Sequence, residues 1–171
     1  MIEVKDIKRF GNLKEEENLR FRQFLKMNAD PDKLDRQFKE LHNKYFKIYD
    51  CSKCRNCCRE LGTVITEDEL DAITKTLHID KEKFKKKYLE EDDDRYKFKT
   101  KSCQFLNNNN CKVKKCLPKS CKDYPFTDKE DRLYSLYSII GNASICPVVY
   151  EILEELKKEY NFKRYVVEFE G

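Results

Sequence analysis

Residues 51–58, CSKCRNCC, place four cysteines within eight positions, and the last two are adjacent. Thiolate sulfur is a soft ligand for zinc, Cu(I) and iron, and C-x-x-C pairs bind a single metal in zinc knuckles and ribbons. On a helix all four sulfurs would share one face, and in a turn each pair could still reach one metal. With either backbone the spacing predicts a metal-binding segment.

Five more cysteines follow this run: Cys103, Cys111, Cys116, Cys121 and Cys146. The adjacent Cys57 and Cys58 leave the backbone in different directions, so they could serve two metals or bridge one polynuclear centre. Eight thiolates could form two four-cysteine sites or one larger centre, with one sulfur left over. Neither common ferredoxin spacing is present, so zinc, iron and an iron–sulfur cluster of another pattern all stay open.

Disulfide bonding is the competing interpretation of so many cysteines. The first ten residues, MIEVKDIKRF, do not resemble a signal peptide, and no apolar stretch approaches the roughly 18 residues of a membrane span. We therefore expect a cytoplasmic protein without a membrane partner, in a compartment that keeps thiols reduced. Nine cysteines cannot all pair within one chain, and a bridge between adjacent cysteines is strained. These observations favour metal binding.

The composition indicates a folded protein with a highly charged surface. Of the 171 residues 40% are charged, yet eleven Phe and ten Tyr supply interior volume. We expect a small single domain of the α+β class, mainly helical, with short strands and irregular loops organised around a cysteine-ligated metal centre.

Helical spacing dominates the first 49 residues. Pro31, with Asp30 as a possible cap, predicts a helix start. The apolar positions of that helix are Leu34, Phe38, Leu41, Tyr45, Ile48 and Tyr49. An earlier helix would carry Leu13, Phe21, Phe24 and Leu25. We expect residues 1–49 to form a helical extension packed on a cysteine-cluster domain at 50–171, although its apolar faces could instead bind an unidentified protein or peptide.

Shorter elements should position the cysteines. Thr66 and Glu69 form a capping box ahead of one helix, and a second would carry Phe84, Tyr88 and Leu89. We expect a solvated loop at 90–94 and strand-like pieces at 96–100, 103–111 and 133–140. The asparagines at 107–110 predict a turn that would place Cys103 and Cys111 opposite each other. Cys146 precedes Pro147, which predicts a helix start there.

Taken together, CSKCRNCC, CQFLNNNNCKV, PKSCKDYPF and the later Cys146 resemble a bacterial and archaeal family named for its C-x-x-C-x-x-C-C motif. That family is described as a zinc- or iron-chelating domain, and some members are labelled Fe–S oxidoreductases. The resemblance spans about residues 50–150 and implies these metal ligands: Cys51, Cys54, Cys57, Cys58, Cys103, Cys111, Cys121 and Cys146. Cys116 is an extra cysteine. Arg55 stands where the family usually has Gly, and Leu117 stands where Arg usually precedes Pro118.

The predicted function is metal binding, with zinc or iron in one or two sites. Closed sites would be structural, whereas an open iron site could support an iron-dependent or Fe–S oxidoreductase or a protein-modifying enzyme. A zinc-dependent nucleic-acid or protein interaction module is a minor alternative, and the lysine-rich segment 112–122 is the basis for considering nucleic acid. The net charge of only +4 and the missing C₂H₂ spacing disfavour nucleic acid. His42 and His78 fall in helical patterns, and we interpret them as ordinary surface residues.

Overall fold

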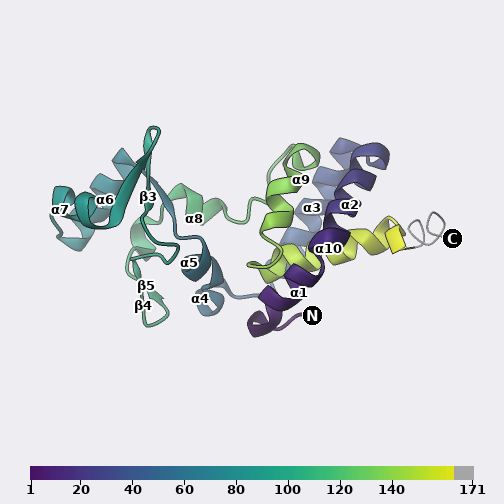
Figure 1. The fold of residues 1–171 in the computed structure, drawn as a ribbon, viewed down its shortest axis with the longest axis horizontal. Coiled ribbons are helices and arrows are strands. Elements are labelled where there is room, and N and C mark those ends of the chain that lie inside the picture. The colour runs from purple at the N-terminus through teal and green to yellow at the C-terminus, as the bar shows by residue number, and fades with distance from the viewer. Residues whose placement is uncertain (164–171) are drawn as a thin grey trace. The chain divides into compact units, whose positions relative to one another are not determined.

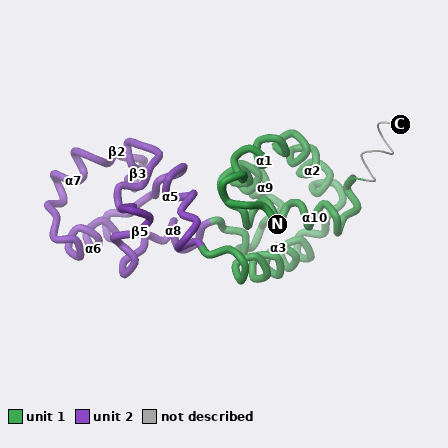
Figure 2. The backbone as a smooth tube through the Cα atoms, turned by 90° about the horizontal axis from the view of Figure 1, so that it is seen from below, with its two compact units in different colours: residues 1–50, 125–171 green, residues 51–124 purple. Residues whose placement is uncertain are grey.

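The computed structural model describes residues 1–163, and its elements are labelled in Figure 1. The chain forms two compact units (Figure 2). One unit consists of Met1–Asp50 together with the described residues from Pro125 onward, and the other is Cys51–Tyr124. The expected division placed everything after residue 49 with the cysteines. In the structure the segment from Pro125 packs with the N-terminal helices instead.

Helices make up the first unit. Their bounds are η1 Val4–Asp6, α1 Ile7–Leu13, α2 Glu15–Asn28, α3 Pro31–Phe46, α9 Arg132–Gly141 and α10 Pro147–Glu159. The α3 helix packs on α9 and α10, and α2 packs on α9. The predicted start of α3 is confirmed, because the Asp30 carboxylate accepts a hydrogen bond from the Lys33 amide at 2.8 Å. The core of this unit contains Phe21, Phe38 and Ile152, all fully buried.

The prediction of a strand over 133–140 was wrong, because these residues lie in α9. Leu133, Leu136 and Ile140 are buried, whereas Tyr134 and Tyr137 are exposed. Spacings of three and four residues between buried positions match a helix rather than the alternation of a strand. Aromatic and β-branched residues favour strands intrinsically, but packing against α2 and α3 overrides that preference.

The second unit combines short helices with two small antiparallel sheets. Its helices are α4 Cys51–Cys54, α5 Asn56–Glu60, α6 Glu67–Leu77, α7 Lys81–Tyr88, η2 Lys114–Cys116 and α8 Lys119–Asp123. Its strands are β1 Val64–Thr66, β2 Leu89–Asp92, β3 Arg95–Phe98, β4 Leu106–Asn107 and β5 Asn110–Cys111. The three-stranded sheet has the order β1-β3-β2, and β4 pairs with β5. A cluster that includes Ile65, Leu70, Ile73, Phe98 and Phe105 forms the core.

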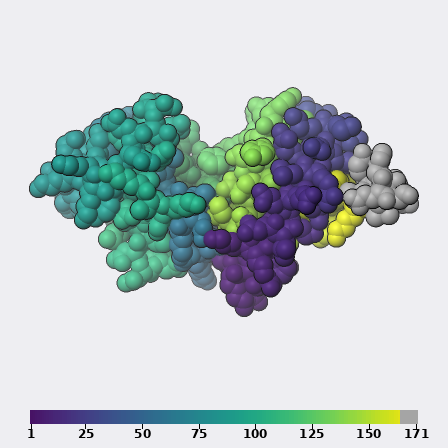
Figure 3. Space-filling view, in the orientation of Figure 1, coloured from purple at the N-terminus to yellow at the C-terminus, as the bar shows by residue number. Residues whose placement is uncertain are grey.

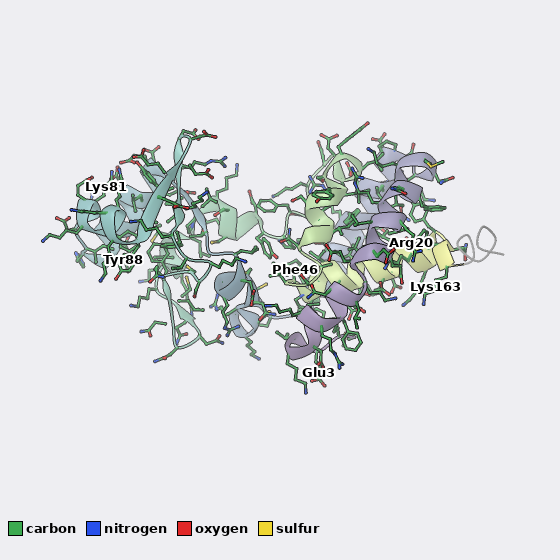
Figure 4. The ribbon with its side chains drawn as sticks, viewed as in Figure 1. Glu3, Arg20, Phe46, Lys81, Tyr88 and Lys163 are labelled. Carbon is green, nitrogen blue, oxygen red and sulfur yellow. The ribbon has the colours of Figure 1, made fainter. Side chains whose placement is uncertain are left out.

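Local signals in this unit were mostly interpreted correctly. The capping box is present, with both hydrogen bonds between Thr66 and Glu69. The second predicted helix is α7, which begins at Lys81 and ends at Tyr88 (Figure 4). Leu89, however, starts β2, and the expected loop at 90–94 is strand up to Asp92. Backbone hydrogen bonds to β3 hold these acidic residues in an extended conformation, and their side chains are exposed.

The observed architecture confirms the expected α+β, mainly helical class. The space-filling view shows one face of each unit, with the N-terminal residues in purple (Figure 3). Among residues 1–163, no helix combines the length and the apolar character that crossing a membrane requires.

Candidate metal centre

The cysteine run is split into two short helices at Arg55. This residue has φ 53°, in the left-handed region, and separates α4 from α5. The four cysteines therefore do not share a single continuous helix. The left-handed region favours glycine, the residue that the family resemblance implies here, and a side chain costs about 1 kcal/mol in it. Arg55 adopts the conformation nonetheless.

The predicted asparagine turn is confirmed as the tip of the β4–β5 hairpin. Leu106 pairs with Cys111, and Asn107 pairs with Asn110. The two residues between these strands, Asn108 and Asn109, have φ 44° and 65°. Asparagine tolerates positive φ better than most residues, so the asparagine run suits a tight two-residue hairpin. The hairpin places Cys111 in the second strand, β5, opposite Leu106.

Asn109 ties this hairpin to the cysteine run. Its carbonyl accepts a hydrogen bond from Nε of Arg55 at 3.2 Å, and its side-chain oxygen accepts from Arg59 at 2.6 Å. Its side-chain nitrogen donates to the carbonyl of Lys53 at 3.2 Å. Arg59 also donates to the carbonyl of Cys54 at 2.8 Å. One turn residue thus contacts both helices that carry the clustered cysteines.

A backbone hydrogen bond brings a third cysteine segment to the same place. The amide of Cys103 donates to the carbonyl of Cys58 at 2.7 Å. The pKa of the Cys103 thiol is raised to about 12, mainly by burial, and the nearby thiols of Cys58, Cys121 and Cys111 act in the same direction. These four cysteines are therefore close enough for their charges to interact.

The thiol of Cys58 is disposed to ionise. A hydrogen bond with the Cys57 side chain lowers the pKa of Cys58 to about 6, against the effect of partial burial. The positive charges of Arg55 and Arg59 act in the same direction. A thiolate is the form of cysteine that binds metals. The guanidinium groups that hold the hairpin therefore also favour the metal-binding form of this cysteine.

Cys121 approaches the centre from α8. Its sulfur lies 3.1 Å from the hydroxyl oxygen of Thr63. Burial raises the pKa of the Cys121 thiol, while hydrogen bonds with Thr63 and Ser120 act in the opposite direction. Thr63 and Asn109 were not among the residues that sequence reasoning identified. No spacing marks Thr63, and the asparagine run by itself indicates only a turn.

Seven of the eight predicted ligands lie in Cys51–Tyr124, and the eighth, Cys146, lies in the other unit. Cys146 precedes Pro147 at the predicted start of α10, and it is buried. The extra Cys116 packs against the core cluster of this unit, as Cys103 and Cys111 also do. His42 lies in α3, where its Nδ1 is 2.8 Å from the Thr127 hydroxyl.

The sulfur atoms of these cysteines are donors of the type that zinc and iron bind. All nine cysteines fall within the described residues and are thiols there, with no disulfide between them. Within residues 1–163, however, no three or more His, Cys, Asp or Glu side chains are arranged so that they could hold a metal ion. The donors are thus of the right type, and all but Cys146 lie in one unit, while the sulfur positions define no coordination geometry.

This chain is mainly helical, and its cysteines come from several segments of the sequence. These two features define the class of cysteine-cluster proteins. Residues 50–146 match the model of the CxxCxxCC family, which is described as "Putative zinc- or iron-chelating domain". The chain belongs to this family, as the resemblance of its cysteine segments indicated. Neither the curated proteins nor the solved structures include a match to it. Membership supports zinc or iron as its ligand.

Proposed function

We propose that the unit Cys51–Tyr124 binds zinc or iron through cysteine thiolates, in one or two sites. The observation that carries this proposal is the hydrogen bond from the Cys103 amide to the Cys58 carbonyl at 2.7 Å. It joins two cysteine segments that are distant in the sequence, while the β4–β5 hairpin brings Cys111 to the same helices through Asn109. Soft sulfur donors brought together in this way suit both metals.

The proposed ligands are the motif cysteines of this unit, and an iron–sulfur cluster is one form that bound iron could take. They are Cys51, Cys54, Cys57, Cys58, Cys103, Cys111 and Cys121. Cys146, which lies in the other unit, stays a ligand that the family resemblance predicts. The proposal also includes a cytoplasmic location, because a reducing compartment keeps thiols available for binding.

Bound zinc would supply a structural cross-link, whereas bound iron would also supply redox chemistry. The surrounding residues would help to retain the metal, whether it is zinc or iron. Arg55 and Arg59 place positive charge beside Cys58 and so offset the repulsion between neighbouring thiolates. The partial burial of Cys103 and Cys121 limits the access of water to their sulfurs. Each of these effects favours a retained metal ion.

A pair of cysteine variants tests this proposal. We expect Cys58→Ser to lose zinc binding, or to weaken it at least about tenfold, because it removes a thiolate from the centre. Cys116→Ser is the matched control, since Cys116 lies in the same unit but outside the family motif. Zinc affinity is measured for both by competition with a chromogenic chelator under reducing conditions. Equal affinities for wild type and Cys58→Ser would contradict the proposal.

A further inference from the structure

Thr63 lies beside one of the proposed ligand sulfurs. Its side chain is only 6% exposed, and its hydroxyl oxygen lies 3.1 Å from Sγ of Cys121. The hydroxyl group is also 2.8 Å from Oγ of Ser120 and 3.4 Å from the carbonyl of Val64. A buried hydroxyl group with these neighbours has few acceptors for its single proton.

The neighbouring serine restricts where the Thr63 proton can go. Oγ of Ser120 donates to the Val64 carbonyl at 2.7 Å, so Ser120 can only accept from Thr63. Thr63 can therefore donate to Ser120, to Cys121 or, over a longer distance of 3.4 Å, to the Val64 carbonyl. A metal-bound thiolate carries no proton and can only accept, and hydrogen bonds to a charged acceptor are roughly twice as strong as neutral ones. Ionisation of Cys121 thus directs the Thr63 proton to its sulfur.

The backbone holds Thr63 in this position. The preceding residue, Gly62, has φ 65°, and a Cβ there would lie 3.2 Å from the carbonyl of Lys101. The following residues form β1, in which Val64 pairs with Lys97 and Ile65 with Tyr96. A sharp turn on one side and a paired strand on the other therefore leave the hydroxyl group little freedom to move away from Cys121.

We propose that Thr63 is a positioning residue for metal binding, in which its hydroxyl group donates a hydrogen bond to the Cys121 thiolate. The proposal rests on the function proposed above, because it gives Cys121 the role of a ligand. The hydrogen bond holds the cysteine side chain in one orientation and offsets part of the negative charge on its sulfur. Partners of this kind typically change metal affinity by about 10- to 100-fold when they are removed.

The test compares zinc affinities, measured by chelator competition, for four reduced proteins. Thr63→Val removes the hydroxyl group while keeping the shape of the side chain, and we expect zinc to bind about 10- to 100-fold more weakly. Thr63→Ser keeps the hydroxyl group and should bind within about threefold of wild type. Thr74→Val is the matched control, since Thr74 is equally buried at 5% but donates to the Leu70 carbonyl. We expect it to bind zinc as wild type does.

A spectroscopic measurement separates positioning from a general loss of stability. With Co²⁺ in place of zinc, thiolate-to-metal charge-transfer bands report directly on the sulfur ligands. We expect these bands to shift in Thr63→Val and to be unchanged in Thr74→Val. Circular dichroism verifies that the variants are folded, and Thr63→Ala replaces the valine variant if that one does not fold.

The outcomes distinguish the two proposals. If wild type and Thr74→Val bind zinc and the Thr63 variants without a hydroxyl group bind it equally well, the role of Thr63 is overturned while metal binding stands. If wild type itself binds no zinc or iron, both proposals fail. Ser120→Ala should weaken binding less than Thr63→Val does, because Oγ of Ser120 donates to the Val64 carbonyl. A loss as large as that of Thr63→Val would identify Ser120 as the donor and contradict our assignment.

Discussion

Arg59 donates a hydrogen bond to the side-chain oxygen of Asn109 at 2.6 Å, across two segments that both carry cysteines. The same amide group donates to the carbonyl of Lys53, the residue before Cys54. Asn109 thus satisfies a carbonyl near the end of α4 and holds a side chain of α5. This amide group therefore helps to fix the β4–β5 hairpin to the cysteine run, together with the hydrogen bond from Arg55 to the Asn109 carbonyl.

Asn109→Gly tests the role of this amide group. Glycine retains the positive φ of the turn but removes two hydrogen bonds of the side chain, so we expect the apo protein to lose about 1 kcal/mol of unfolding free energy. Asn108→Gly is the control, because its φ is also positive and its side chain is outside this network. Urea unfolding measures both variants. Equal losses would show that the turn geometry, and not the amide group, holds the hairpin.

Gly11 allows α1 to approach the chain after α9. A Cβ at this position would lie 2.6 Å from the carbonyl oxygen of Ala143 and would also overlap the backbone of Ser144. Because backbone cannot yield as a side chain does, we expect Gly11→Ala to destabilise the protein by about 3 kcal/mol. Gly141→Ala has nothing within 4 Å of the added methyl group and should be neutral or stabilising by up to about 1 kcal/mol. Thermal unfolding of both variants measures the difference in stability. Similar melting temperatures would contradict the close packing of Gly11 against the backbone of Ala143 and Ser144.

Lys157 is a nearly fully buried cation whose ammonium group lies 2.7 Å from Glu17 and 2.6 Å from Glu154. Lys157→Met fills the same space but leaves two partly buried carboxylates with less positive charge, and we expect a loss of about 2 to 3 kcal/mol. Lys158→Met is the control, since Lys158 is 72% exposed and its ion pair with Glu155 should contribute less than about 0.5 kcal/mol. Urea unfolding gives both values. A loss in Lys158→Met as large as that in Lys157→Met would contradict the importance of burial.

His42 should make the stability of the first unit depend on pH. Burial lowers the pKa of His42 from its ordinary value of 6.5, and Lys129 lowers it further while Asp128 opposes both. The unfolded chain therefore binds this proton more tightly than the folded one. The unfolding free energy should fall as pH decreases through about 6.5 and level off below the lowered pKa of the folded state.

The titration of His42 is measured by NMR, and His78→Gln assigns its resonance because the chain has only two histidines. We expect His42→Gln to reduce the change in unfolding free energy between pH 7 and pH 5. An unshifted titration of His42, or an unchanged pH dependence in the variant, would contradict the effect of burial.

Local signals with a specific chemical cause could be predicted from the sequence. Asp30 before Pro31, the capping box of Thr66 and Glu69, and the asparagine turn each satisfy particular backbone groups, and each is present. The α9 helix was missed because its β-branched and aromatic residues favour strands. The grouping of the segment from Pro125 with the N-terminal helices depends on long-range packing that no local pattern encodes.

The candidate site shows the same contrast. Cysteine spacing identified the segments that come together, because a soft donor repeated at short intervals has few other uses. Thr63 was beyond prediction, since its relation to Cys121 exists only once β1 and α8 lie side by side. Arg55 was noted as a departure from the family pattern, and the structure adds the reason that glycine suits the position, namely its positive φ.

The most direct test of metal binding is elemental analysis, together with an absorption spectrum, of wild-type protein purified without air. Exclusion of oxygen matters because a cluster lost to oxidation could be replaced by zinc. We predict one or more equivalents of zinc or iron per chain, with visible thiolate-to-iron bands if the metal is iron. Protein that contains neither metal, resists thermal unfolding equally well before and after chelator treatment, and has nine titratable thiols in its native state would contradict the central claim.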